Sequence, residues 1–384
     1  MRELTPPSTL ARAIERLQRQ VWPVRVAGLA TVFAVVAYIE FWLDPDLSLY
    51  AFYLIPAIYS TWFLSVRWGY VTCVASSAVW LVDGWRLETF YHHPFISYWN
   101  LGMRAIALVV VVAIVNLLKT ELEARHQMER QRVQDDLAIA REVQLRLLPS
   151  DPPSYPGLDL GYFYRPAQSV GGDYYDFIPL SSERLGIVVA DVSGKGLPGA
   201  LLMASLQGLV HNTTPLYEGE ISEFVSALNA SLYKRTTANR YATMFFGIVD
   251  TARLTFDYVS AGHDPPFLLR KDQLSAVTLE PLDHGGPPVG ILPRSQYESE
   301  RLDLRRGDVL VVYTDGVTDA QNLRQEEFGT ERLRQTIEEA LTLPAVEICK
   351  RVSDSLEAFT GDSPQTDDIT LVVMKVGAPS ISIG

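Results

Sequence analysis

The sequence predicts an α-helical transmembrane module followed by an α+β catalytic domain. Three features of the 384-residue chain support this fold class: apolar stretches within the first 118 residues, a charged segment of good helix formers after them, and short β-rich runs with turns and helices from about Leu158 onward. Strands that cluster, with helices segregated between them, favour α+β over a regular α/β alternation. The length is sufficient for both parts.

Four apolar stretches predict four transmembrane helices, because a helix of about 20 residues crosses a bilayer. They cover residues 24–43, 49–66, 68–82 and 98–118. Tryptophans lie near the ends of these stretches, where interfacial aromatic side chains are expected. A buried helical bundle in a soluble protein is the alternative.

Basic residues around these stretches predict their orientation. With four spans all the basic clusters fall on one side, whereas the loops at 44–48 and 83–97 hold mostly acids. The positive-inside rule then places both ends in the cytoplasm. We therefore expect a cytoplasmic segment at 1–23, a four-helix module at 24–118 in the inner (cytoplasmic) membrane, and a cytoplasmic catalytic domain at 151–378.

Residues 119–150 form a predicted linker helix. The segment is rich in Glu, Gln, Arg, Leu and Ala, and Pro149 ends it, since proline cannot continue a helix. A short seam with alternating four- and three-residue steps consists of Val133, Leu137, Ala140 and Leu147, with Gln144 in the remaining position. Two interpretations remain open: a coiled coil that forms a homodimer, or a surface helix that covers the next domain.

The charge balance argues against nucleic acid as a partner. The formal net charge is −12, and the chain offers no dense basic face for phosphates. The two cysteines, Cys73 and Cys349, make a disulfide framework unexpected, and no Cys/His pattern has zinc-like spacing. The acidity suits the binding of cations.

The β-rich part of the chain has a recognisable order of strands and helices. Strands are expected at 185–192, 242–250, 254–260, 266–270, 309–314 and 369–375. Helices are expected at 198–212, 222–236, 331–340 and 345–360.

Aspartates gather at the ends of these strands, beside glycine in three of four places. The four segments are Gly171-Gly172-Asp173-Tyr174-Tyr175-Asp176, Asp191-Val192-Ser193-Gly194, Thr314-Asp315-Gly316 and Thr366-Asp367-Asp368. Each Asp-Gly alone predicts only a tight turn. Four segments whose carboxylates share a centre would repel one another unless a cation neutralised them. An all-oxygen set of ligands selects hard ions such as magnesium, manganese or calcium.

Seven segments in order resemble the catalytic domain of SpoIIE-type phosphatases, bacterial relatives of the type 2C (PPM) serine/threonine phosphatases. They read GGDYYDF, ADVSGKGLPGALLMA, TMFFGIVD, SAGHDPPFLLR, GGPPVGI, YTDGVTDA and TDDITLVV, and the resemblance covers about 158–376. It implies a two-layer β-sandwich flanked by helices, with two divalent cations, Mn²⁺ or Mg²⁺, at one end.

The resemblance also implies roles for individual residues. Asp191 would bridge both cations, the backbone carbonyl of Val192 would join one of them, Asp315 and Asp367 would complete the first site, and Asp173 would serve the second.

Two further acids, Asp176 and Asp368, are neighbours of this set, and in each doublet the first acid is preferred as the ligand. The wider class holds phosphate with an arginine, for which Arg165 is a positional candidate and a plain surface residue the alternative. Gly194-Lys195-Gly196 lacks the full GxxxxGK[ST] spacing of a nucleotide-binding loop.

The implied reaction is the hydrolysis of phosphoserine or phosphothreonine by a water that lies between two metal ions. The implied substrate is a phosphorylated STAS-domain protein, an anti-anti-sigma factor in a partner-switching pathway controlled by the membrane module. The rival functions are a catalytically inactive phosphatase-like receptor, a nucleotide or diguanylate cyclase, and a transporter. The retained aspartates argue against the inactive receptor, and the absence of a GGDEF turn argues against the cyclase. The absence of an intramembrane acid pair argues against the transporter.

Overall fold

The computed structural model describes residues 17, 20–42, 50–86, 94–214, 220–236, 240–271 and 277–377. Most of the basic N-terminal segment and the acidic loop at 44–48 lie outside the described residues. The chain divides into two compact units, Met1–Arg132 and Val133–Gly384, and each is described here by itself.

The N-terminal unit is built from helices. They are α2 (Trp22–Trp42), the 3₁₀ turn η1 (Tyr50–Tyr53), α3 (Leu54–Phe63), α4 (Val66–Arg86) and the first part of α5 (Pro94–Leu147). Among the described residues, two helical segments are long and apolar enough to cross a membrane, Trp22–Trp42 and Tyr98–Leu147, and the apolar part of α4, Val66–Val82, is shorter. The structure therefore supports two of the four expected spans by length and composition.

The structure does not support the expected span at 49–66 by helix length. Its α-helical part, α3, has 10 residues, a length of about 15 Å, which is half of the roughly 30 Å hydrocarbon core of a bilayer. The helix ends because Leu64 leaves helical geometry, and the backbone N–H groups of Leu64 and Ser65 both bond to the carbonyl of Ser60. The chain then enters α4 at once.

Small polar residues fill the contact between α3 and α4. The side chains of Ser60, Thr61 and Thr72 are buried, and Thr72 Oγ1 donates to Ser60 Oγ at 3.1 Å. A Cβ on Gly69 would lie 2.2 Å from Thr61 Oγ1, so the close approach of the helices requires glycine. Interfaces of small and hydroxyl residues are typical of helix packing in membranes.

The helix α5 joins two predicted elements into one. The expected fourth span and the expected linker helix form a single unbroken helix of 54 residues, about 80 Å long. The boundary between them, at residues 118 and 119, lies inside this helix. The sequence after Pro94 contains no further proline up to Leu147, and the helix tolerates its single glycine, Gly102.

The C-terminal unit is a β-sandwich of two mainly antiparallel sheets. Within the described residues, the first sheet has the order β1-β11-β10-β6-β7, and the second has the order β2-β3-β4-β5-β8 with β9 paired to β5. The first comprises β1 (Leu158–Arg165), β11 (Ile369–Val376), β10 (Val309–Tyr313), β6 (Phe267–Lys271) and β7 (Val277–Pro281). The second comprises β2 (Tyr174–Pro179), β3 (Arg184–Val192), β4 (Ala242–Asp250), β5 (Thr255–Ala261), β8 (Gly285–Gly286) and β9 (Glu300–Asp303).

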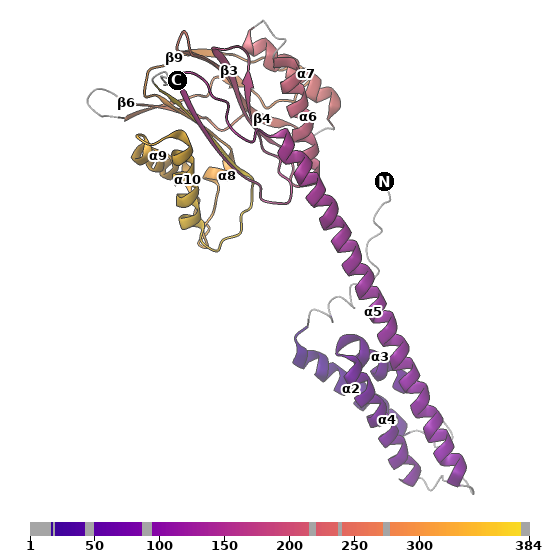
Figure 1. The fold of residues 1–384 in the computed structure, drawn as a ribbon. Helices are drawn as coiled ribbons and strands as arrows, with labels where there is room; N and C mark the ends of the chain where they lie inside the picture. Colours follow the sequence, from indigo (N-terminus) through magenta and orange to yellow (C-terminus); the bar gives the residue numbers. More distant parts are fainter. Residues whose placement is uncertain are drawn as a thin grey trace, which may run out of the picture. The chain divides into compact units, whose positions relative to one another are not determined.

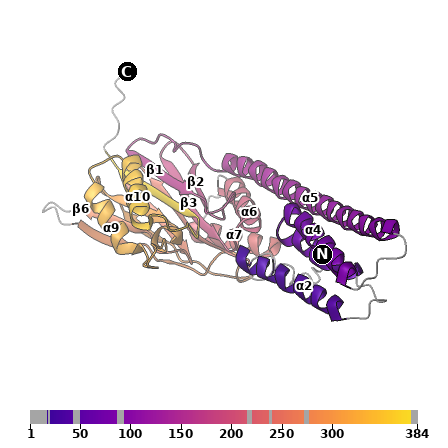
Figure 2. The ribbon, with the colours of Figure 1, turned by 90° about the horizontal axis from the view of Figure 1, so that it is seen from below.

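Two pairs of helices cover the outer faces of the sandwich. The helices α9 (Gly329–Ala340) and α10 (Ala345–Thr360) lie on one side of the strands, and α6 (Leu197–Thr213) and α7 (Ile221–Arg235) lie on the other, as Figures 1 and 2 both show. One apolar core lies between the sheets and under α6 and α7, and a second lies between the first sheet and α9 with α10. The expected sandwich flanked by helices is therefore the architecture observed.

Aromatic rings in the core between the sheets should carry much of the domain's stability. Phe256 is fully buried, with its ring centroid 6.2 Å from that of Phe245 and 6.1 Å from that of Tyr258. We expect Phe256→Ala to lower the free energy of unfolding by about 3–5 kcal/mol, because it removes a ring and leaves a cavity.

Near-ultraviolet circular dichroism during thermal unfolding would measure this change. The control is Leu323→Ala, since Leu323 is 73% exposed, and we expect it to act within about 0.5 kcal/mol. An equal loss for both variants would contradict the assignment of the core.

Candidate active site

Antiparallel pairing brings four strand ends to one end of the sandwich. In the second sheet Tyr174 pairs with Ala190, so the start of β2 lies beside the end of β3. In the first sheet Tyr313 pairs with Leu371, so the end of β10 lies beside the start of β11. The four predicted acidic segments occupy these four ends, and the fold therefore collects them.

Asp173 connects the two sheets. It precedes β2 in the second sheet, and its side chain is almost fully buried. Its Oδ2 accepts hydrogen bonds from Thr314 Oγ1 at 2.7 Å and from Thr370 Oγ1 at 2.5 Å, both from the first sheet. Thr370 N also donates to Thr314 Oγ1 at 3.1 Å. These threonines fix the carboxylate between the sheets.

Strand alternation separates Asp173 from Asp176. Successive side chains of a strand point to opposite faces, and the ring of Tyr175 stacks on Tyr162 of the other sheet, with centroids 4.8 Å apart. Asp173 shares the face of Tyr175. Asp176 lies on the opposite face, where its Oδ2 is 3.2 Å from Nε2 of His211 on α6 and accepts from the hydroxyl of Tyr174 at 2.8 Å.

The same alternation places Asp191 beside Asp173. Val189 pairs with Tyr175, so Val189, and Asp191 two residues later, share the face between the sheets. Val192 ends β3, and its carbonyl oxygen lies 3.2 Å from the point where a Cβ on Gly172 would stand. Glycine at 172 leaves the space in front of that carbonyl open.

Asp367 and Asp368 point to different partners. Asp367 Oδ2 forms an ion pair with Lys195 Nζ at 2.8 Å. Asp368 accepts from the backbone N–H of Ala167 at 2.7 Å and of Gly172 at 2.5 Å. Asp368 therefore ties down the loop that leads to β2, whereas Asp367 faces the Lys195 loop.

The carboxylates lie near enough to perturb one another. Burial raises the pKa of Asp191 to about 7, with further contributions from the charges of Asp315 and Asp367. Burial, and then Asp367, raises the pKa of Asp315 to about 6. The pKa of Asp173 is raised well above its usual range, first by burial and then by Asp191. Each shift expresses the cost of placing negative charge in this region.

This donor set fits a hard divalent cation in its chemistry. The ligands offered are carboxylate and carbonyl oxygens, and a cation would offset the repulsion that raises these pKa values. Among the described residues no three acidic, His or Cys side chains already stand together as tightly as the ligands of a bound ion.

Known proteins resemble the C-terminal part of the chain. The profile of the family "Stage II sporulation protein E (SpoIIE)" matches residues 181–377, about half of the chain. The chain belongs to the SpoIIE family. Phosphoserine phosphatase RsbU of Bacillus subtilis is 33% identical over 249 residues, which are 64% of this chain and 71% of that protein.

Protein IcfG of Synechocystis is 29% identical over 269 residues, and the match spans 62% of this chain but only 41% of IcfG. The RsbU and RsbW domains of Rv1364c from Mycobacterium tuberculosis give a TM-score of 0.51 at 28% identity, covering 61% of this chain and 64% of that one. The SiaA-PP2C domain of Pseudomonas aeruginosa gives 0.55 at 19% identity, covering 64% and 98%. The catalytic unit is thus a serine/threonine phosphatase domain with the PP2C-type fold.

Three residues to which no sequence motif assigns a function hold acids of this site in place. Thr314 and Thr370 hold Asp173, and Lys195 holds Asp367 and also donates to the carbonyl of Thr366 at 2.7 Å. In the sequence, the position of Lys195, four residues after Asp191 and between two glycines, indicates that it belongs to the site. The motif of nucleotide-binding loops does not indicate this role, because Lys195 binds a carboxylate.

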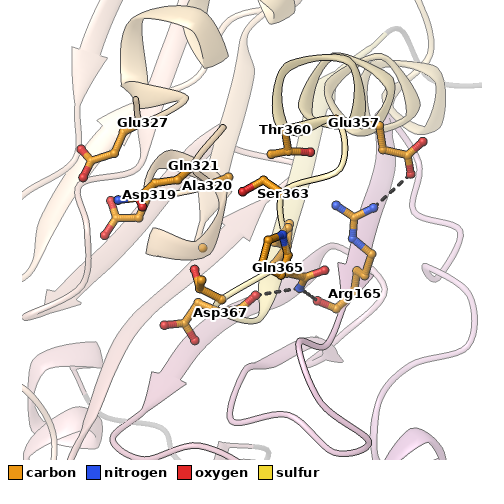
Figure 3. Close-up of a pocket in the computed structure, with 15 residues that line it drawn as sticks. Arg165, Asp319, Ala320, Gln321, Glu327, Glu357, Thr360, Ser363, Gln365 and Asp367 are labelled. Atoms are coloured by element: carbon orange, nitrogen blue, oxygen red, sulfur yellow. Dashed lines mark hydrogen bonds and ion pairs between the residues drawn. The ribbon is translucent and has the colours of Figure 1, made fainter. Parts of the chain in front are cut away.

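A cavity of about 630 Å³ adjoins the carboxylates, between the end of α10 and the loops at the strand ends (Figure 3). Asp367, Gly316 and Asp319 line its side toward the carboxylates, and Arg165 and Glu357 line another part. Arg165 Nη1 forms an ion pair with Glu357 Oε1 at 3.0 Å. Arg165, the positional candidate for holding phosphate, thus shares a cavity with Asp367 but is engaged by an acid.

His263 is placed for a structural role. It is buried, its Nδ1 lies 3.0 Å from Thr243 Oγ1, and burial lowers its pKa to about 4. A histidine that stays neutral at pH 7 and lies inside the fold is poorly suited to proton transfer with a substrate.

The raised pKa values predict how the metal-free chain responds to pH. Asp191 and Asp315 have pKa values near 7 and 6 in the fold, against 3.8 in the unfolded chain. Their protonation favours the folded state, so this stability is fully present below pH 3.8 and is lost as the pH rises through 6 and 7. His263 acts in the opposite sense, but only below pH 6.5. We expect the melting temperature in EDTA to fall by roughly 2 °C from pH 6.5 to 8.

Differential scanning calorimetry of the wild type and of Asp191→Asn at both pH values would measure this. The amide cannot ionise, so the variant should show a smaller fall. A wild-type melting temperature that rises over this interval, or an equal fall in the variant, would refute the electrostatic assignment.

Proposed function

We propose that this chain hydrolyses phosphoserine or phosphothreonine on a regulatory protein, with two divalent cations, Mn²⁺ or Mg²⁺, as cofactors. The observation that carries the proposal is the meeting of Asp173, Asp191, Asp315 and Asp367 at one end of a sandwich of the SpoIIE family. The relatives RsbU and RsbP are named phosphoserine phosphatases, which supports the same reaction class.

In this proposal each acid has a distinct task. Asp191 would contribute to both cation sites, and the carbonyl of Val192 would contribute to one of them. Asp315 and Asp367 would complete the first site, and Asp173 would serve the second. The chemistry that bound cations would supply is the activation of a water as a nucleophile near neutral pH.

The surrounding residues prepare this site. Thr314 and Thr370 orient the carboxylate of Asp173 by donating to one of its oxygens, which leaves the other free of these bonds. Lys195 places a positive charge within 2.8 Å of Asp367, where it can also attract the phosphate dianion of a substrate. Asp176 and Asp368 remain outside the proposed ligand set, since one contacts His211 and the other accepts from two backbone N–H groups.

We propose a phosphorylated STAS-domain protein, an anti-anti-sigma factor in a partner-switching pathway, as the substrate. The support is the resemblance of the catalytic segments to the SpoIIE type and the match to RsbU over 71% of its length. In this proposal the phosphorylated residue enters the cavity beside Asp367.

We also propose that the N-terminal unit lies in the cytoplasmic membrane as a multi-pass module and controls the phosphatase. Only 11% of the apolar window of each candidate span is buried within the protein, unlike the core helix of a soluble protein. Exposed large apolar side chains on these helices include Val35, Tyr38, Phe41, Val74, Ile106, Val110 and Ile114.

A homodimer through α5 is proposed on the exposure of its apolar side chains. Val133, Ile139 and Val143 are 54%, 63% and 57% exposed. Of the expected seam, Val133 belongs to this exposed set, whereas Gln144 is buried against the catalytic unit of its own chain. The pairing surface would therefore differ from the predicted seam in its C-terminal half.

Removal of proposed ligands tests the function. We expect Asp191→Ala and Asp315→Ala each to reduce Mn²⁺-dependent phosphate release from a phosphoserine protein at least about 100-fold, because loss of a ligand should cost more than loss of a supporting residue. Release of inorganic phosphate by the full chain in detergent would be measured with and without EDTA.

Asp354→Ala is the matched control, since Asp354 is an exposed aspartate on α10, and its turnover should equal that of the wild type. Undiminished turnover in either ligand variant would overturn the proposed mechanism.

A further inference from the structure

A glutamine of the linker helix contacts the loop that carries Asp173. Gln144 lies in the last two turns of α5, and its side chain is buried. Its Nε2 donates to the carbonyl of Gly171 at 2.7 Å, and its Oε1 accepts from the backbone N–H of Gly171 at 3.0 Å. One amide side chain therefore satisfies both backbone groups of a single buried residue.

The loop at Gly171 has little freedom to move elsewhere. A Cβ at Gly171 would lie 2.5 Å from Tyr164 Oη and 2.9 Å from Asp368 Oδ2, so the backbone is packed closely against both side chains. The next residue, Gly172, donates its N–H to Asp368 at 2.5 Å. Asp173 follows directly. The hydrogen bonds of Gly171 and Gly172 therefore fix the backbone position from which the Asp173 side chain extends.

The end of α5 is itself fixed to the sandwich. Leu148 is buried, the hydroxyl of Tyr175 donates to the carbonyl of Pro149 at 3.1 Å, and the hydroxyl of Tyr162 donates to the carbonyl of Ser150 at 2.6 Å. These contacts hold the backbone on the C-terminal side of Gln144. Gln144 therefore lies at a helix end that is anchored to the sandwich.

We propose that Gln144 is a positioning residue that sets the affinity of the cation site served by Asp173 by fixing the peptide groups on both sides of Gly171. The inference rests on the proposed function, and Gln144 itself touches neither cation nor substrate in it. Glutamine suits the role because it offers a donor and an acceptor together, whereas glutamate offers only acceptors at neutral pH. Without it, two buried backbone groups would lose their partners and the loop would have to shift to find others.

Two substitutions of similar size separate the two hydrogen bonds. Gln144→Glu keeps an acceptor for the N–H of Gly171 but faces its carbonyl with a second acceptor. Gln144→Met keeps the length and removes both bonds. Gln134→Met is the matched control, since Gln134 is exposed on the same helix.

The full chain in detergent micelles would be titrated with Mn²⁺ alone by isothermal calorimetry. We expect the dissociation constant of one of the two sites, the one served by Asp173, to rise about 10-fold in both Gln144 variants, as for residues that support metal ligands, and to stay unchanged in Gln134→Met. Hydrogen exchange should accelerate in the peptide that spans 168–174 and not across the strands. At saturating Mn²⁺, kcat should return to within about threefold of the wild type.

Wild-type Mn²⁺ affinity together with unchanged exchange at 168–174 in Gln144→Met would overturn the positioning role. Faster exchange throughout the sandwich, with a kcat that Mn²⁺ does not restore, would also overturn it, because Gln144 would then be only a general packing residue. Either result leaves the proposed phosphatase function intact, since that proposal fails on a different measurement, undiminished turnover in Asp191→Ala or Asp315→Ala.

Discussion

The carboxylates at one end of the sandwich repel one another, and much of the surrounding structure offsets that repulsion. Burial and neighbouring charges raise the pKa values of Asp173, Asp191 and Asp315. Hydroxyl, ammonium and backbone N–H donors lie against the acids of the same region. These donors come from several strand ends and loops, so the position of each depends on the correct assembly of both sheets.

Close packing of the backbone is the second requirement of this arrangement. A Cβ at Gly316 would lie 1.9 Å from the carbonyl oxygen of Asp368, and one at Gly172 would lie 3.2 Å from that of Val192. The glycines beside Asp315 and Asp173 therefore stand where segments approach one another closely, and not only in a local turn. A side chain at either position would push apart the strand ends whose proximity creates the site.

The linker helix belongs energetically to the catalytic unit at its C-terminal end. Gln144 and Leu148 are buried there, whereas Ile139 and Val143 are exposed. Because α5 is unbroken from Pro94 to Leu147, the helix that contains an apolar candidate span also supplies a partner for the loop before Asp173. One face of the helix covers the catalytic unit through Gln144, and another face leaves Ile139 and Val143 exposed.

The sequence alone determined the strands that carry the chemistry. The runs at 185–192 and 369–375 correspond closely to β3 and β11 because they are continuous apolar segments bounded by acids. It overestimated the stretch at 49–66, where hydropathy is high but the helix ends at Phe63. Only the tertiary structure decided which distant groups meet, such as Asp173 with Thr370 or Gln144 with Gly171. Contacts of this kind depend on sheet register and helix docking, and no local pattern of residue types encodes them.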